Sequence, residues 1–116
     1  MPESIIDPAI FAELQDSAGA DFAMELVDTF LDEAPGMLAA LHDAAAQGDA
    51  DSFRRAAHSL KSNSQTFGAT QLGVLARDLE LGGLGALGDG AGAALERLNA
   101  AYQQAAAALK ALCHGG

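Results

Sequence analysis

Apolar residues recur at intervals of three and four along most of the chain, the spacing of one face of an α-helix. This pattern predicts helices over about residues 7–16, 21–47, 50–67, 70–81 and 91–112. The alternation of apolar and polar residues that marks a half-buried strand is missing from the sequence. We therefore expect an all-α protein.

The longest predicted helix, over about residues 21–47, gathers its apolar residues on one side. They are Leu26, Val27, Phe30, Ala34, Met37, Leu41, Ala44 and Ala45. Pro35 falls inside this helix, but the apolar phase continues past it, which predicts a bend rather than an end. Asp7 before Pro8, and Asp49 after a glycine, have the composition of helix starts.

The C-terminal part combines a glycine-rich segment with a regular helix. Residues 82–92 contain six glycines, which predicts a flexible connection rather than a helix. The helix over about residues 91–112 carries a narrow apolar seam made of Leu95, Leu98, Tyr102, Ala105, Leu109 and Leu112. Short connections between four long helices predict an up-down-up-down antiparallel four-helix bundle with a short extra N-terminal helix. We expect a single domain over residues 1–116.

Composition and charge narrow the class of protein further. Half of the residues are hydrophobic and the formal net charge is -10, which argues against nucleic acid and membrane surfaces as partners. No apolar run reaches the roughly 18 residues of a membrane span, and the first residues do not resemble a signal peptide. The single cysteine, Cys113, has no partner for an internal disulfide. We expect a cytoplasmic protein.

One stretch, RRAAHSLKSNSQTFGA (residues 54–69), departs from this acidic character. It holds three of the six Lys and Arg residues and none of the sixteen Asp and Glu residues. Continuing to Arg77 adds a fourth cation and still no carboxylate. On a helical wheel, the buried side is formed by Phe53, Ala57, Leu60, Ser64 and Phe67. His58 lies roughly 140° from the centre of that side, so we expect it to face solvent.

The neighbours of His58 on the helix surface are the residues three and four positions away. They are Arg54, Arg55, Lys61 and Ser62. A phosphoryl group carries about -1.5 to -2 charges near neutral pH, so these donors would favour one attached to the imidazole. The same residues also fit an ordinary solvated helix face.

AAHSLKSNSQTFGATQLGVLARDLE, residues 56–80, resembles the signature of histidine-containing phosphotransfer (HPt) domains. The matching positions are His58, Leu60, Lys61, Ser62, Gly68, Ala69, Leu79 and Glu80. Upstream, FLDEAPGMLAAL (residues 30–41) resembles the preceding helix of that family, including its proline. The resemblance extends over about residues 7–112 and implies the helical bundle that the periodicity predicts independently.

The resemblance implies a phosphocarrier of a bacterial-type two-component phosphorelay, a phosphoprotein without kinase activity of its own. His58 would accept a phosphoryl group, through Nε2, from the aspartyl-phosphate of a response-regulator receiver domain, or donate it in the reverse direction. No cofactor or metal is expected on this chain, because the receiver domain brings the Mg²⁺. The expected partners are receiver domains and a hybrid sensor histidine kinase, and an exposed active histidine suits a monomer.

The resemblance also suggests roles for residues around His58. Lys61 would offset phosphate charge, and Glu80 would accept a hydrogen bond from Nδ1, although a plain surface carboxylate fits Glu80 equally well. Ser62 replaces a commoner glycine and narrows the approach of a receiver. Gln65 is a candidate contact to phosphate or receiver, or an ordinary polar surface residue. The candidates for receiver docking are Arg54, Arg55 and Arg77, with solubility or helix pairing as the alternative.

A different class of function stays open, a helical-bundle protein-interaction module that is never phosphorylated. The presence of both His58 and Lys61 favours the relay. A di-iron bundle needs a Glu three residues before each ligating His, but Ala39 and Arg55 stand before His42 and His58. The chain fits a free-standing carrier and also an excised domain of a hybrid kinase. The sequence does not identify the partner kinase, the receiver or the direction of phosphoryl flow.

Overall fold

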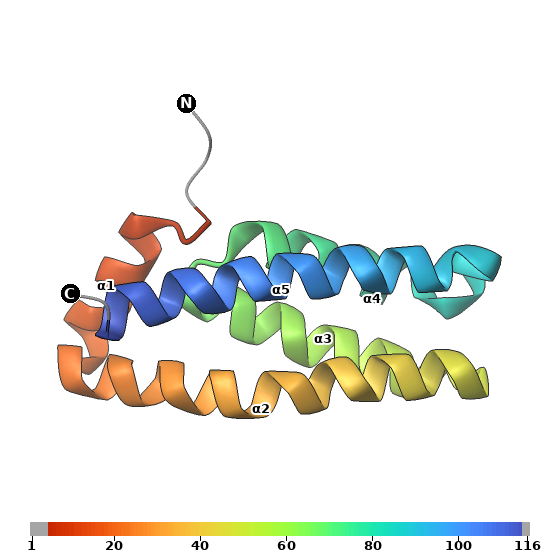
Figure 1. Cartoon of the computed structure of the whole chain (residues 1–116), viewed down its shortest axis with the longest axis horizontal. Coiled ribbons are helices and arrows are strands. Elements are labelled where there is room, and N and C mark those ends of the chain that lie inside the picture. The colour runs from red at the N-terminus through yellow and green to blue at the C-terminus, as the bar shows by residue number, and fades with distance from the viewer. Residues whose placement is uncertain (1–4, 115–116) are drawn as a thin grey trace.

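A computed structural model describes residues 5–114; the rest of the predicted domain, residues 1–4 and 115–116, lies outside the described residues. The helices in chain order are α1 (Pro8–Ala18), α2 (Ala20–Gln47), α3 (Ala50–Phe67), α4 (Thr70–Leu87), the 3₁₀ turn η1 (Gly88–Gly90) and α5 (Ala91–His114). The four long helices run alternately up and down, and α1 lies across one end (Figure 1). The predicted all-α four-helix bundle with an extra N-terminal helix is confirmed.

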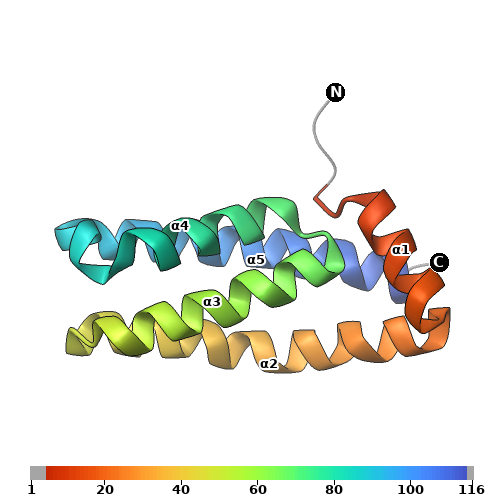
Figure 2. The same ribbon diagram turned by 180° about the vertical axis from the view of Figure 1, so that it is seen from behind.

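The four long helices enclose one core. Helix α2 has 28 residues and so measures about 42 Å, which equals the 42 Å length of the molecule. α2 packs on α3, α3 on α4, α4 on α5, and α5 on α2, and the view from behind shows α3 between α2 and α4 (Figure 2). In the core, the ring of Phe30 lies 5.2 Å from that of Phe67 and 6.2 Å from that of Tyr102, centroid to centroid. These ring contacts join α2, α3 and α5. Helix α2 continues through Pro35, so the prediction that it does not end there is confirmed.

Helix α3 begins and ends where its sequence signals predict. The Asp49 side chain accepts a hydrogen bond from the backbone N–H of Ser52, and Gly68 ends the helix in the left-handed conformation with φ 78°. The predicted stripe is buried along its whole length: Phe53, Ala57, Leu60, Ser64 and Phe67. The hydroxyl of Ser64 donates to the Leu60 carbonyl at 2.6 Å, which satisfies the one polar group in that stripe.

The glycine-rich segment is more helical than the sequence indicates. We predicted a flexible connection over residues 82–92, but α4 extends to Leu87 and η1 follows it directly. Gly83, with φ 75° and ψ 168°, divides α4 into two helical pieces close to the helix end predicted at about residue 81, and Gly88, with φ 51° and ψ -126°, ends the second piece. Leu84 and Leu87 are partly buried against the core. Burial of these two leucines outweighs the poor helix propensity of the surrounding glycines.

Two other details of the predicted apolar faces are wrong. In α2, Leu38 is buried although it was not in the predicted stripe, whereas Leu26 and Met37 are only partly buried. At the end of the α5 seam, Leu112 is 54% exposed. It lines an open apolar hollow together with residues of α1. Because α1 is short, it covers this end of α5 incompletely, and the last residue of the predicted apolar seam stays exposed.

The start of helix α1 is hydrogen-bonded to the turn between α3 and α4. Its N-cap, Asp7, accepts a hydrogen bond from the backbone N–H of Ala9 at 2.9 Å, while the Asp7 N–H donates to the Gly68 carbonyl at 2.8 Å. A Cβ at Gly68 would lie only 2.9 Å from the Asp7 carbonyl oxygen. Glycine is therefore required at 68 by both the positive φ and the close approach of α1.

Candidate functional site

The buried stripe of α3 turns His58 outward onto the surface shared with α4. The His58 side chain is 57% exposed, and it contacts the side chain of Glu80 of α4, which is 14% exposed. The two atoms in contact, His58 Nδ1 and Glu80 Oε2, are 2.7 Å apart. The other ring nitrogen, Nε2, is separated from Nδ1 by one ring carbon, so its in-plane lone pair points away from this contact. An exposed ring is thus held in one orientation by a largely shielded carboxylate.

Lys61 holds the other oxygen of the same carboxylate. Its Nζ lies 2.8 Å from Glu80 Oε1, an oxygen removed from solvent, and the lysine side chain is only 20% exposed. The contact is an ion pair by distance rather than a well-aligned hydrogen bond. Glu80 therefore bridges His58 and Lys61, which stand one turn apart on α3.

This bridge determines the protonation of the site. The contact with Lys61, and next the contact with His58, hold the pKa of Glu80 below its ordinary value. Glu80 is therefore a carboxylate at neutral pH and can only accept hydrogen bonds. The neutral imidazole must then carry its proton on Nδ1 and donate it to Oε2, which leaves the lone pair on Nε2 facing away from Glu80.

The arginines before His58 are paired rather than free. Both guanidinium groups bind the carboxylate of Asp51: Arg54 Nη2 lies 2.8 Å from Oδ1, and Arg55 Nη2 contacts Oδ2. The bond with Arg54, followed by the charge of Arg55, lowers the pKa of Asp51. The cationic stretch of residues 54–69 begins at Arg54, and Asp51 stands just before it. Its spacing of three and four residues from the arginines is a helical ion-pair signal that the sequence already contained.

The remaining predicted residues lie further along the same face. Arg77 is exposed, and its Nη2 lies 3.7 Å from Asp78 Oδ1. Ser62 and Gln65 are exposed, one and two turns after His58. The cations of residues 54–77 thus meet three carboxylates, which reduces the local positive charge that the sequence suggested. An open depression of about 430 Å³ beside the imidazole is lined by Arg54, Arg55, His58, Ser59 and Glu80.

Two further observations concern residues 5–114 as a whole. No group of three or more His, Cys, Asp or Glu side chains is arranged there to hold a metal ion. None of the described helices is both long enough and apolar enough to cross a membrane.

The fold and this site together define a helical-bundle histidine phosphotransfer protein. The sequence model of the Hpt domain matches residues 25–114, and the chain belongs to the Hpt domain family. The crystal structure of histidine-containing phosphotransfer protein B (HptB) from Pseudomonas aeruginosa PAO1 is similar, with a TM-score of 0.89 and 27% sequence identity. The match covers 99% of this chain and 99% of that one. A search of curated protein sequences finds no significant match.

Membership of the family establishes the general function. The chain is a histidine phosphotransfer protein of phosphorelays, a phosphocarrier rather than an enzyme with catalytic activity of its own. Proteins of this family interact with kinases and response regulators. An unphosphorylated interaction module is not favoured.

Proposed function

We propose that His58 is the phosphoryl acceptor and that it reacts through Nε2 with the aspartyl-phosphate of a response-regulator receiver domain. The observation that carries the proposal is the 2.7 Å contact between His58 Nδ1 and Glu80 Oε2. Because that contact occupies Nδ1 with a proton, the exposed side of the ring offers a nucleophilic lone pair. The His58 ring can therefore attack phosphorus in the orientation that the contact with Glu80 gives it.

The transfer is a displacement at phosphorus. The Nε2 lone pair forms the P–N bond while the P–O bond to the receiver's aspartate breaks, and the aspartate leaves as a carboxylate. The imidazole gains positive charge as the bond forms, and Nδ1 keeps its proton. The Glu80 carboxylate, 2.7 Å away, stabilises that charge in the transition state and in the phosphorylated ring. The reverse displacement returns the phosphoryl group to a receiver aspartate.

Residues around the imidazole support the phosphoryl group in this proposal. Lys61 keeps Glu80 ionised and in place, and its flexible stem can bring the ammonium toward a phosphoryl group on Nε2. Ser62 and Gln65 lie on the His58 face and face the incoming receiver. Arg54 and Arg55, together with Arg77, meet acidic groups around the receiver's aspartate. The receiver supplies the Mg²⁺, and this chain contributes no cofactor.

We propose that the protein is cytoplasmic and acts as a monomeric single domain. It receives its phosphoryl group within a relay that a hybrid sensor histidine kinase starts. Its net charge of -10 supports protein partners rather than nucleic acid.

The test is transfer from a receiver domain labelled on its aspartate with radioactive phosphate. Receivers are profiled against the wild-type chain, His58→Gln and His42→Gln, the last a matched change at another exposed histidine. The wild type and His42→Gln should gain label that is labile in acid and stable in alkali, as a P–N bond is, and His58→Gln should gain none. Equal labelling of wild type and His58→Gln, or no labelling by any receiver, contradicts the proposal.

A further inference from the structure

The turn of α3 that precedes His58 carries two arginines, and one carboxylate binds both of them. Arg54 and Arg55 stand four and three residues before His58, which places them beside it on the helix surface. Arg54 Nη2 lies 2.8 Å from Asp51 Oδ1, and Arg55 Nη2 contacts Asp51 Oδ2. A single negative charge thus holds two positive ones, so the three side chains together keep an excess of positive charge beside the imidazole.

The imidazole of His58 lies over this preceding turn. Side chains on an α-helix lean toward its N-terminus, so a ring at position 58 covers the turn before it rather than the turn after it. The open depression beside the ring agrees with this direction, because Arg54 and Arg55 line it, whereas Lys61 of the following turn is not among the described residues that do. With a volume of about 430 Å³, the depression has room for a phosphoryl group on Nε2.

Lys61 is less available to such a group than the arginines are. Its ammonium is the largest influence that keeps Glu80 ionised. Moving it to a phosphoryl group would leave Glu80 Oε1, an oxygen removed from solvent, without the positive charge beside it. The side chains of Arg54 and Arg55 are 56% and 73% exposed. Ion pairs so exposed contribute little to stability, so both arginines can leave Asp51 at small cost.

A phosphoryl group competes with Asp51 for the arginines at an advantage. It carries about -1.5 to -2 charges near neutral pH and three acceptor oxygens, whereas a carboxylate carries one charge and two oxygens. Guanidinium groups bind phosphates through two parallel hydrogen bonds, as they bind carboxylates. Building on the proposed function, we propose that Arg54 and Arg55 exchange Asp51 for the phosphoryl group when His58 is phosphorylated. Asp51 is then their counter-ion in the unphosphorylated protein alone.

This exchange gives the two forms of the protein different charged surfaces beside His58. In the unphosphorylated form, Asp51 neutralises part of the arginine charge. In the phosphorylated form, the arginines neutralise the added phosphoryl charge, and Asp51 is left as an exposed carboxylate. Once the phosphoryl group has passed to a receiver, the arginines return to Asp51 and attract the receiver's acidic groups less strongly. Asp51 thereby favours release of the receiver after transfer.

The test is a titration of the phosphoryl group in the isolated phosphoprotein, followed by phosphorus NMR after the receiver has been removed. Arginines bound to the phosphoryl group favour its dianion and so lower its second pKa. Arg54→Gln combined with Arg55→Gln should therefore raise that pKa, moving the midpoint of the titration up by about one pH unit. Arg97→Gln, a matched change at an exposed arginine of α5, should leave the midpoint where it is in the wild type.

A second pair of variants tests the part of Asp51. Asp51→Asn removes the competitor for the arginines, so the phosphoryl pKa should fall further than it does in Asp49→Asn. The latter variant removes the same charge two residues earlier and keeps a residue that can cap α3. The difference between the two variants should vanish when both arginines are replaced by glutamine. Glu80 and Lys61, the other charged groups beside the ring, stay the same throughout.

The outcomes separate this inference from the proposed function. An unchanged pKa in the double arginine variant, or an equal rise in Arg97→Gln, overturns binding of the phosphoryl group by these arginines while His58 labelling stands. Equal falls in Asp51→Asn and Asp49→Asn overturn the exchange, because net charge alone would then account for both. Failure of every receiver to label the wild type, or labelling of His58→Gln, overturns the proposed function and the exchange with it.

Discussion

Glu80 and His58 are 22 positions apart in the chain, yet Glu80 Oε2 and His58 Nδ1 lie 2.7 Å apart across the α3–α4 groove. The carboxylate is shielded and ionised, while the ring that it holds is open to solvent. One side chain therefore sets both the tautomer of the imidazole and the direction in which its lone pair points. Lys61 completes the arrangement by pairing with the second carboxylate oxygen.

Replacing Glu80 by alanine or by glutamine distinguishes its role in orienting the His58 ring from the role of its negative charge. Glu80→Ala removes the acceptor of the Nδ1 proton, so nitrogen NMR of the His58 ring should show the Nδ1–H tautomer losing its predominance. Phosphotransfer from a receiver should slow about tenfold or more, as expected for a lost hydrogen bond to a charged group. Glu80→Gln keeps an oxygen acceptor and should lie between wild type and alanine in both measurements. An unchanged tautomer in Glu80→Ala would show that Glu80 does not orient the ring.

Lys61 is the largest influence on the ionisation of Glu80. Lys61→Met keeps the length of the side chain and removes the ammonium, so the pKa of the Glu80 carboxyl should rise toward its ordinary value of 4.5. Carbon NMR titration of the glutamate carboxyl groups measures this directly. Because a lowered pKa means that the folded state favours the carboxylate, the rise should appear as protonation of Glu80 at higher pH in the variant. No rise would place the cause of the lowered pKa elsewhere.

The turn that presents α3 depends on Gly68. Gly68→Ala introduces a Cβ at 2.9 Å from the Asp7 carbonyl oxygen and in a left-handed backbone conformation. We expect a loss of about 1–3 kcal/mol in the free energy of unfolding, measured by chemical denaturation. The matched control is Gly36→Ala, where a Cβ meets nothing within 4 Å inside α2 and should stabilise by about 0.5–1 kcal/mol. Equal effects at both positions would contradict the role of the turn.

Asp51 competes with any acidic partner for two arginines. Asp51→Asn releases Arg54 and Arg55 from their ion pairs, so association with an acidic receiver surface should become several-fold faster at low ionic strength. The gain should fade as salt screens the charges. Stopped-flow binding measures this, with Asp16→Asn on α1 as a control of equal charge change. A gain of the same size in the control would show that net charge, and not the release of these arginines, drives association.

Local signals in the sequence were sufficient to predict α3. Asp49 and Gly68 mark its ends because a carboxylate cap and a left-handed glycine act within a few residues. The repeat of apolar positions then determines which side is buried, and the exposure of His58 follows from it. The pairs of Asp51 with Arg54 and Arg55 are equally local but were not predicted, because Asp51 stands just before the cationic stretch of residues 54–69.

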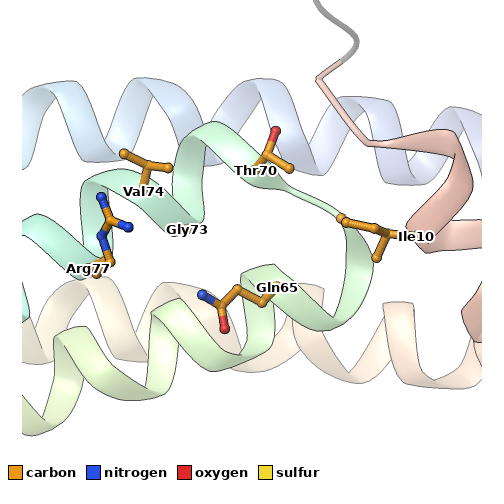
Figure 3. Close-up of a pocket in the computed structure, with 7 residues that line it drawn as sticks. Ile10, Gln65, Thr70, Gly73, Val74 and Arg77 are labelled. Carbon is orange, nitrogen blue, oxygen red and sulfur yellow. The ribbon is translucent and has the colours of Figure 1, made fainter.

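Tertiary features needed the structure. Periodicity cannot set the register of α3 against α4, so the contact between His58 and Glu80 was suggested only by the family resemblance. Nor does propensity predict that burial of Leu84 and Leu87 accompanies a short helical piece between Gly83 and Gly88, inside a glycine-rich segment. A small hollow lined by Ile10, Gln65 and Val74 forms where α1, α3 and α4 meet, which no local sequence pattern encodes (Figure 3).

The most direct test identifies the nitrogen that carries phosphorus. The wild-type chain, labelled with ¹⁵N in its histidines and phosphorylated by a receiver, is examined by NMR for the position of the phosphoryl group on the His58 ring. Because Glu80 occupies Nδ1 through its proton, the phosphoryl group should be found on Nε2, with Nδ1 still protonated. A phosphoryl group on Nδ1, or on a residue other than His58, would contradict the account.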